Sequence, residues 1–130
     1  MNSFTIDVSV PVFVQEYKQA LKKFPSIKND ISEAFGSLEK SPEIGDAIPG
    51  YARALWKLRI GVKGRFGKRG GYRLIYHVDA ERSVITPIAL YFKADTPDLP
   101  VHEVSKRFLA VARAVGAIPD PPVIPPEVSN

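Results

Sequence analysis

The sequence of 130 residues predicts an α+β domain, in which helices pack on a small, mainly antiparallel sheet. Residues 13–38 contain two stretches with an apolar side chain every three or four positions, which is typical of helices with one buried face. Between residues 56 and 93 the apolar period becomes two, and short turns separate the alternating stretches, as in an antiparallel meander. The expected order is therefore one strand, two helices, three strands and a last helix.

The composition excludes several classes of protein. A hydrophobic content of 45% and a charged content of 25% are ordinary for one globular domain. Without cysteine there is no disulfide, thiol nucleophile or cysteine metal site, and the two histidines do not form a metal cluster, so we expect no metal and no cofactor. Asp7 lies where a signal peptide would be apolar, and no apolar run approaches the roughly 20 residues that cross a bilayer. We therefore expect a cytoplasmic protein without a membrane partner.

The N-terminal part predicts a strand followed by a helical hairpin. Residues 4–9 alternate between apolar and polar side chains. The first helix should end near Lys23, because Pro25 disfavours helical geometry at the residue before it. The second helix ends at Ser41-Pro42, and the short connection between the helices favours an antiparallel pair. Residues 44–51, rich in Gly and Pro, are expected to form a loop. The apolar stripes of the two helices are Phe13, Tyr17, Leu21 and Phe24, and then Ile27, Ile31, Ala34 or Phe35, and Leu38.

The meander is expected over residues 56–62, 72–78 and 84–93. Residues 64–71, with four Gly, form the predicted tip of the first hairpin. Pro87 cannot donate a hydrogen bond to a neighbouring strand, so the third strand should contain a bulge or start late.

The C-terminal part predicts one helix and a tail. The helix opens at Thr96-Pro97 or at Asp98-Leu99-Pro100. Its expected inner side consists of Val104, Phe108, Val111, Ala112 and Val115. After Gly116 the chain is dense in proline and is expected to lie outside the core. We therefore divide the chain into a domain over residues 1–116 and a flexible, proline-rich tail over residues 117–130.

The positive charge of the chain is concentrated in one window. Between Ala47 and Val78 there are eight Lys or Arg residues and no acidic residue. Since the whole chain carries a net charge of +4, the rest of the sequence sums to −4. Such a local patch indicates a polyanionic partner, with nucleic acid as the leading candidate. The alternative is a solvated strand pair with a basic hairpin.

The two-residue period places a set of polar side chains on one face of the sheet. If Trp56, Tyr72 and Leu90 face the helices, the opposite face carries the polar positions of all three strands. Like charges on neighbouring strands destabilise a sheet unless an anion lies among them. Each residue alone has an ordinary alternative, such as a solvated strand, an ion pair or a half-buried ring, but the shared face favours a site. The set consists of Lys57, Arg59, Arg73, His77, Tyr91 and Lys93.

Several segments resemble the RelE/ParE superfamily of toxins, and within it the RelE-like, HigB-type branch. They are residues 55–60 (LWKLRI), 67–76 (GKRGGYRLIY), 90–95 (LYFKAD) with Asp98-Leu99, 23–30 (KFPSIKND), and 42–46 (PEIGD) with 48–50 (IPG). The resemblance covers roughly residues 10 to 100, in order, and excludes the last helix and the tail. It implies a RelE-like fold.

The resemblance also implies an activity and partners. Members of this family are metal-independent endoribonucleases that cleave mRNA, usually on the ribosome, and thereby inhibit translation. The ribose 2′-hydroxyl attacks the adjacent phosphate, which gives a cyclic phosphate and a free 5′-hydroxyl. A cognate antitoxin protein silences the toxin. The implied partners of this chain are therefore the antitoxin, mRNA and the ribosome.

The family's functional residues are carried over to matching positions. Lys57 and Arg59 match the two basic strand residues, Arg73 matches the Arg of the Tyr-Arg pair, and Lys93 lies at the basic end of the last strand. Arg or Lys donors stabilise the charge that builds up on the phosphate oxygens, and Tyr91 is expected to stack on a base. The predicted RNA-binding residues around the basic hairpin are Lys63, Arg65, Lys68 and Arg69.

The sequence leaves alternatives open for the residues that transfer protons and for the function itself. Some relatives use a tyrosine in the C-terminal segment, but residues 96–103 contain none. Lys57, His77 and His102 are the candidates for the base or acid, because crowding by cations favours neutral lysine and histidine titrates near neutrality. The alternative functions on the same fold are a non-catalytic RNA-binding or ribosome-binding module and a ParE-like gyrase inhibitor.

Overall fold

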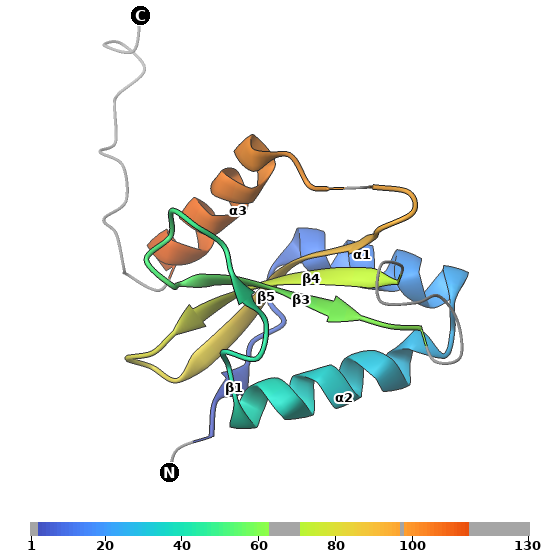
Figure 1. Ribbon diagram of the computed structural model, residues 1–130, viewed down its shortest axis with the longest axis horizontal. Helices are drawn as coiled ribbons and strands as arrows, with labels where there is room; N and C mark the ends of the chain where they lie inside the picture. The colour runs from blue at the N-terminus through green and yellow to red at the C-terminus, as the bar shows by residue number, and fades with distance from the viewer. Residues whose placement is uncertain (1–2, 63–70, 97, 115–130) are drawn as a thin grey trace, which may run out of the picture.

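A five-stranded sheet in the order β1-β5-β4-β3-β2 forms the centre of the protein (Figure 1). The computed structural model describes residues 3–62, 71–96 and 98–114. β1 pairs in parallel with β5, and the other neighbours pair antiparallel. The elements are β1 (Thr5–Ile6), α1 (Pro11–Lys23), α2 (Ile27–Lys40), β2 (Asp46–Ala47), β3 (Leu55–Ile60), β4 (Tyr72–Asp79), β5 (Val84–Phe92) and α3 (Val101–Ala114).

The α+β class and the predicted order of elements are confirmed. The loop prediction for residues 44–51 was wrong at Asp46 and Ala47, which form β2 against β3. Two residues are too few to show an alternating pattern, so no periodicity indicated this strand.

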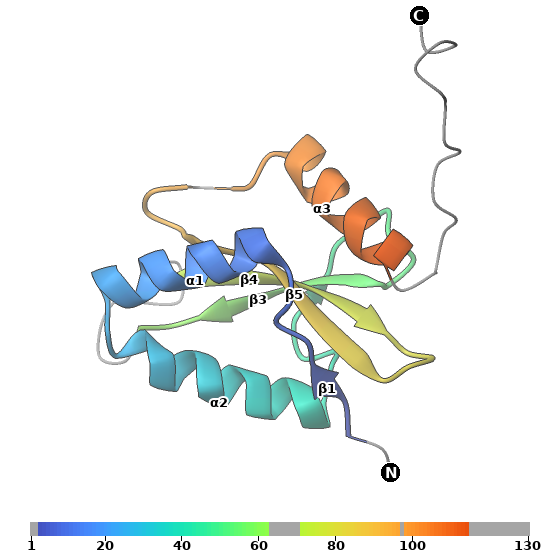
Figure 2. The same ribbon diagram turned by 180° about the vertical axis from the view of Figure 1, so that it is seen from behind.

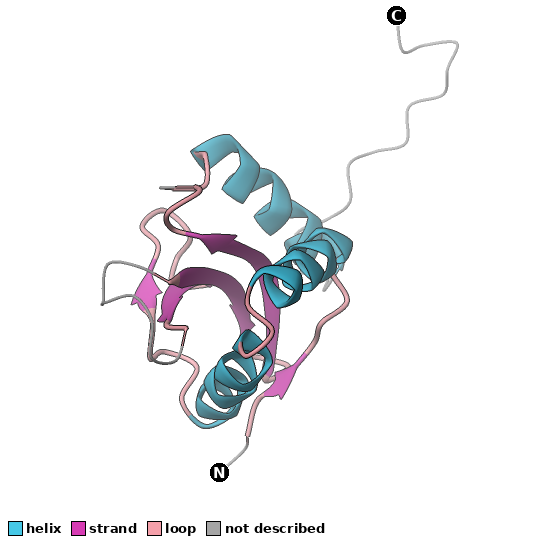
Figure 3. Cartoon of the chain, turned by 90° about the vertical axis from the view of Figure 1, so that its right-hand side faces the viewer, coloured by secondary structure: helices cyan, strands magenta, loops and turns pink. Residues whose placement is uncertain are grey.

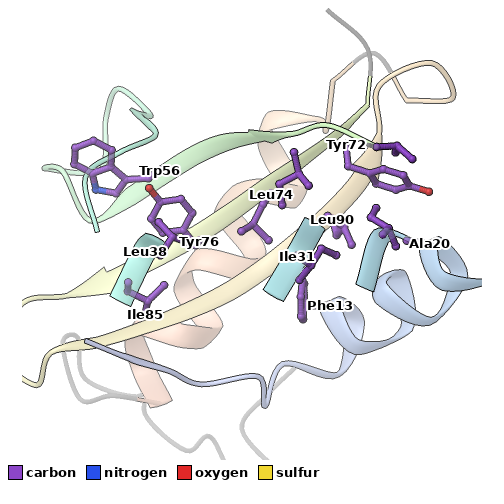
Figure 4. Packing of buried hydrophobic residues seen from close by; sticks show 13 residues of the cluster. Phe13, Ala20, Ile31, Leu38, Trp56, Tyr72, Leu74, Tyr76, Ile85 and Leu90 are labelled. Carbon is purple, nitrogen blue, oxygen red and sulfur yellow. The ribbon is translucent and has the colours of Figure 1, made fainter. Parts of the chain in front are cut away.

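α1 and α2 cover one face of the sheet with their apolar stripes. Phe13 and Ala20 from α1 and Ile31 and Leu38 from α2 are buried against it (Figure 4). The two helices run in opposite directions along this face (Figure 2), which confirms the predicted hairpin. The sheet residues in this core are Trp56, Ile60, Tyr72, Leu74, Tyr76, Ile85 and Leu90.

α3 packs on the opposite face. Its buried residues Val104 and Val111 join a second core with Leu55, Ile75 and Ala89 from the sheet. In Figure 3 the curved sheet lies between α3 and α2. The second face is therefore partly apolar and covered, and its polar residues do not form one continuous exposed surface.

A β-bulge lies at the proline of β5. Ile75 pairs with Ala89, but the next residue, Tyr76, pairs with Pro87, so Ile88 has no partner in the register. This confirms the bulge expected at Pro87. Beyond α3, the predicted inner residue Val115 and the proposed tail lie outside the described residues, and the division of the chain into a domain and a tail stays a prediction.

Candidate functional site

A row of polar side chains crosses the three central strands near the β3–β4 connection. Arg59 on β3 lies opposite Arg73 on β4, and Arg73 lies opposite Tyr91 on β5. Lys57 lies in the adjacent row, opposite Ile75. Because side chains alternate along a strand, these four residues share the face opposite the α1–α2 core. We call Lys57, Arg59, Arg73 and Tyr91 the basic cluster.

The members of the basic cluster differ in their access to solvent. Arg59 is exposed and Lys57 is half-buried, whereas Arg73 and Tyr91 are only 7% and 6% exposed. The Arg73 guanidinium donates from Nη1 to the Tyr72 carbonyl at 3.3 Å. Lys93 directly follows β5 and is half-buried; its backbone N–H donates to the Gly71 carbonyl at 2.9 Å, which holds it at the same end of the sheet.

An acidic residue from the loop before α3 contacts the basic cluster. Oδ1 of Asp98 lies 3.2 Å from Lys57 Nζ, 3.1 Å from Tyr91 Oη and 3.2 Å from the backbone nitrogen of Leu99. Asp98 was not among the predicted site residues, although the resemblance included the Asp98-Leu99 pair. Its contact with β3 and β5 depends on the path of a loop, which strand alternation does not reveal.

These contacts shift the pKa values of Asp98 and Tyr91 in opposite directions. Partial burial raises the pKa of Asp98, but the hydrogen bonds from Lys57, Tyr91 and Leu99 and the charge of Lys57 outweigh it and hold the pKa below its ordinary value. Burial, together with the negative charge and hydrogen bond of Asp98, raises the pKa of Tyr91 to about 12. At neutral pH Tyr91 is therefore a neutral hydroxyl that donates to a carboxylate.

His77 is placed apart from the basic cluster. It pairs with Leu55 and Thr86, four residues along β4 from Arg73, which is about 13 Å in an extended strand. The residue is 4% exposed, the centroid of its ring lies 5.8 Å from that of Phe108 on α3, and Nδ1 has no hydrogen-bond partner among the described residues. Burial lowers the pKa of His77, and the charge of Asp79 opposes this only in part.

The other predicted residues do not join the basic cluster. His102 is exposed in the first turn of α3. Among the residues with a described position, no group of three or more His, Cys, Asp or Glu side chains is placed to hold a metal ion. Likewise, no helix over these residues is long and apolar enough to span a membrane. The predicted RNA-binding residues Lys63, Arg65, Lys68 and Arg69 lie outside the described residues.

A groove of about 510 Å³ lies between α3 and the segment that joins β1 to α1. Val10, Val12, Ala110 and Val111 form much of its apolar wall, and Arg107 is among its polar residues. Its lining includes none of the residues of the basic cluster, so the groove is a separate feature.

No protein-family model matches the sequence. Among solved structures, the protein is similar to a mutant of the E. coli toxin RelE in the free state, with 18% sequence identity and a TM-score of 0.53. The match covers 85% of this chain and 99% of the RelE chain. It shows a RelE-like fold, as the sequence resemblance predicted, and the HigB-type branch stays a prediction.

Proposed function

We propose that this protein is the toxin of a type II toxin–antitoxin system, of the HigB-type branch, and acts in the cytoplasm as an mRNA endoribonuclease on the ribosome. The observation that carries the proposal is the row Arg59–Arg73–Tyr91 with Lys57 beside it, on a RelE-like fold. Three cations and a neutral hydroxyl at one end of a sheet face suit an RNA phosphate better than a packed core.

The proposed reaction is attack of the ribose 2′-oxygen on the adjacent phosphorus. The new P–O bond forms as the bond to the 5′-oxygen breaks; the 2′-hydroxyl loses a proton and the leaving 5′-oxygen gains one. Arg59 and Arg73 can each place two N–H groups on phosphate oxygens, while Lys57 and Lys93 act as point charges. A buried guanidinium such as Arg73 is held in place before the charge develops, which is how such donors lower a barrier most.

The proposal revises two of the roles that were expected from the sequence. The Tyr91 ring is buried, so its hydroxyl is better suited to the reaction than its face is to base stacking. His77 lies under α3, so Lys57 is favoured over His77 as the group that exchanges a proton with the substrate. The basic hairpin residues are proposed to follow the RNA backbone.

Cleavage of mRNA by the purified protein, alone and with programmed ribosomes, tests this proposal. We expect cleavage with ribosomes, and a loss on the order of 100-fold for Arg59→Ala, because removal of one donor to the developing charge typically costs this much. Lys28→Ala removes an exposed cation of α2, on the other side of the sheet, and should leave cleavage unchanged. RNA binding without cleavage would favour the non-catalytic module, and DNA damage without arrest of translation would favour the gyrase inhibitor.

A cognate antitoxin is proposed as the partner that silences the toxin. The window of eight cations on an otherwise acidic chain would attract an acidic segment of another protein. Co-purification with the product of a neighbouring short reading frame is the direct test. If that product does not bind, or binds without suppressing toxicity, the toxin–antitoxin part of the proposal is wrong.

A further inference from the structure

We propose that Lys57 Nζ, Tyr91 Oη and the Leu99 backbone N–H form a binding site for one non-bridging phosphate oxygen, which the Asp98 carboxylate fills when RNA is absent. The identity of the ligand as RNA phosphate rests on the proposed function. The site itself rests on the contacts of Asp98, and it adds two residues, Asp98 and Leu99, to those predicted from the sequence.

The geometry supports an oxyanion site. All three donors converge on the same atom, Asp98 Oδ1, at 3.1 to 3.2 Å. The fold brings two of them, Lys57 on β3 and Tyr91 on β5, to Asp98 from 41 and 7 positions away, and the third belongs to the residue that follows Asp98. A phosphate oxygen, like a carboxylate oxygen, is an anionic acceptor that binds ammonium, hydroxyl and backbone N–H donors. Tyr91 stays protonated to well above neutral pH, since its pKa is about 12, and therefore remains a donor.

Asp98 is placed so that it can leave. Its side chain is 69% exposed, and its partner Lys57 is also partly exposed. Ion pairs in such positions contribute little to stability. The Leu99 donor belongs to the backbone, so rotation of the Asp98 side chain toward solvent leaves all three donors in place. The phosphate and the carboxylate cannot occupy the site together, because both are negative.

A competitor and a structural tether predict opposite results. If Asp98 merely ties its loop to the sheet, its neutralisation loosens Lys57 and Tyr91 and weakens anion binding. If Asp98 competes with phosphate, its neutralisation strengthens anion binding. The direction of the change therefore decides between them.

The experiment measures binding of a fluorescently labelled, fully 2′-O-methylated oligoribonucleotide, which has no 2′-hydroxyl to react, to the full chain by fluorescence anisotropy. We expect Asp98→Asn to bind on the order of fivefold more tightly than the unaltered protein, which is the effect of removing one like charge at close range. Asp95→Asn is the matched control. Asp95 lies in the same loop and is similarly exposed, but it pairs with Lys23 at 2.7 Å.

Two further measurements complete the test. Inorganic phosphate should displace the oligonucleotide from Asp98→Asn at lower concentration than from the unaltered protein. Adding Tyr91→Phe to Asp98→Asn should abolish the gain, because one of the three donors is lost. Thermal melting of each variant tests whether it is folded. If Asp98→Asn does not fold, Asp98→Ala serves as the second variant without the negative charge.

Each outcome either supports or overturns the inference. Equal or weaker binding by Asp98→Asn, or an equal gain in Asp95→Asn, would overturn it. Because the probe cannot be cleaved, the result does not depend on catalysis. If the protein does not cleave mRNA but Asp98→Asn binds the oligonucleotide more tightly, the proposed enzyme is refuted and the anion site is supported. If the protein cleaves mRNA but Asp98→Asn does not bind more tightly, the anion site is refuted and the proposed enzyme is supported.

Discussion

One guanidinium joins three elements of the fold. Arg107 of α3 donates to both carboxylate oxygens of Glu16 on α1, to Glu103 on α3 and to the Ile88 carbonyl at the bulge of β5. Glu16 also accepts the backbone N–H of Leu90. The Arg107 side chain is 9% exposed. Charged groups this deeply buried require their partners, because an isolated buried charge is strongly unfavourable.

Replacement of Arg107 should therefore destabilise the protein. We expect Arg107→Ala to lower the free energy of unfolding by about 3 kcal/mol, since it leaves the Glu16 carboxylate without its bidentate donor. Urea denaturation followed by circular dichroism measures the change. Lys106→Ala, at the exposed neighbouring position of α3, should change it by less than about 0.5 kcal/mol. A loss as small as that of Lys106→Ala would show that Arg107 does not anchor the helix.

Burial of His77 should make stability depend on pH. Because burial places its pKa in the folded state below the ordinary value, the unfolded chain binds the proton more readily. The contribution of His77 is therefore complete above pH of about 6.5 and decreases as the pH falls below that value. His77 faces Phe108 of α3 and Leu55 and Thr86 of the neighbouring strands, and Asp79 of its own strand opposes the shift.

Urea denaturation between pH 7 and pH 5 tests this dependence. His77→Phe should flatten the decline in unfolding free energy over this range, because the titrating ring is gone. His102→Asn, which removes the exposed histidine of α3, should retain the decline. If His77→Phe declines as steeply as the unaltered protein, another group causes the effect.

The positions of individual candidate residues were predictable where strand alternation alone determined them. Alternation placed Lys57, Arg59, Arg73 and Tyr91 on one face, and the register aligns three of them in a row. It placed His77 on the same face, correctly, but it could not show that α3 covers that position. Asp98 was missed because its contacts also depend on distant parts of the chain. A loop brings it to Lys57 and Tyr91, which lie 41 and 7 positions away.

At the scale of elements, the short strand β2 pairs with β3, and the segment before it packs closely against Tyr76 and Lys57. Tyr76 Oη accepts the backbone N–H of Gly45 at 3.2 Å and donates to the Pro42 carbonyl at 2.8 Å. A Cβ on Gly45 would lie 2.5 Å from the Lys57 carbonyl oxygen and 2.9 Å from Tyr76 Oη. The segment before β2 thus approaches the backbone of Lys57, a residue of the basic cluster.

Two glycine substitutions with opposite expected effects test this packing. Gly45→Ala should lower the free energy of unfolding by roughly 1–3 kcal/mol, because backbone atoms must move apart. Gly36→Ala, in α2, meets no atom within 4 Å and should raise it by about 1 kcal/mol, because alanine favours a helix. Urea denaturation of both variants gives the comparison. A neutral Gly45→Ala would show that β2 can move away from β3 at no cost.

Most elements of the fold were predictable because their signals are local. The helical stripes and the prolines predicted the ends of α1 and α2 to within a residue or two. Pro87 predicted either a bulge or a late start of the strand, and the bulge is observed. The parallel pairing of β1 with β5 and the position of α3 depend on contacts between distant parts of the sequence. No local periodicity encodes them.

At the scale of the whole molecule, the two faces of the sheet differ in what covers them. α1 and α2 cover one face with an apolar core, and α3 covers part of the other. The basic cluster lies beside α3 on the second face, near the connection that contains four further cations. Among the described residues, three cations of the basic cluster thus lie together on this face, and the Asp98 carboxylate contacts one of them, Lys57.

Binding of single-stranded RNA should therefore weaken with salt through these residues in particular. Each phosphate neutralised on a single strand contributes about −0.7 to the slope of the logarithm of the binding constant against the logarithm of the salt concentration. Arg59→Gln should make this slope less negative by about 0.7, measured with the uncleavable oligonucleotide between 50 and 200 mM potassium chloride. Lys28→Gln removes an equal charge from α2 and should leave the slope unchanged. Equal changes in both variants would mean that RNA binding depends on the net charge of the protein and not on a particular site. The basic cluster would then not be the phosphate-binding site.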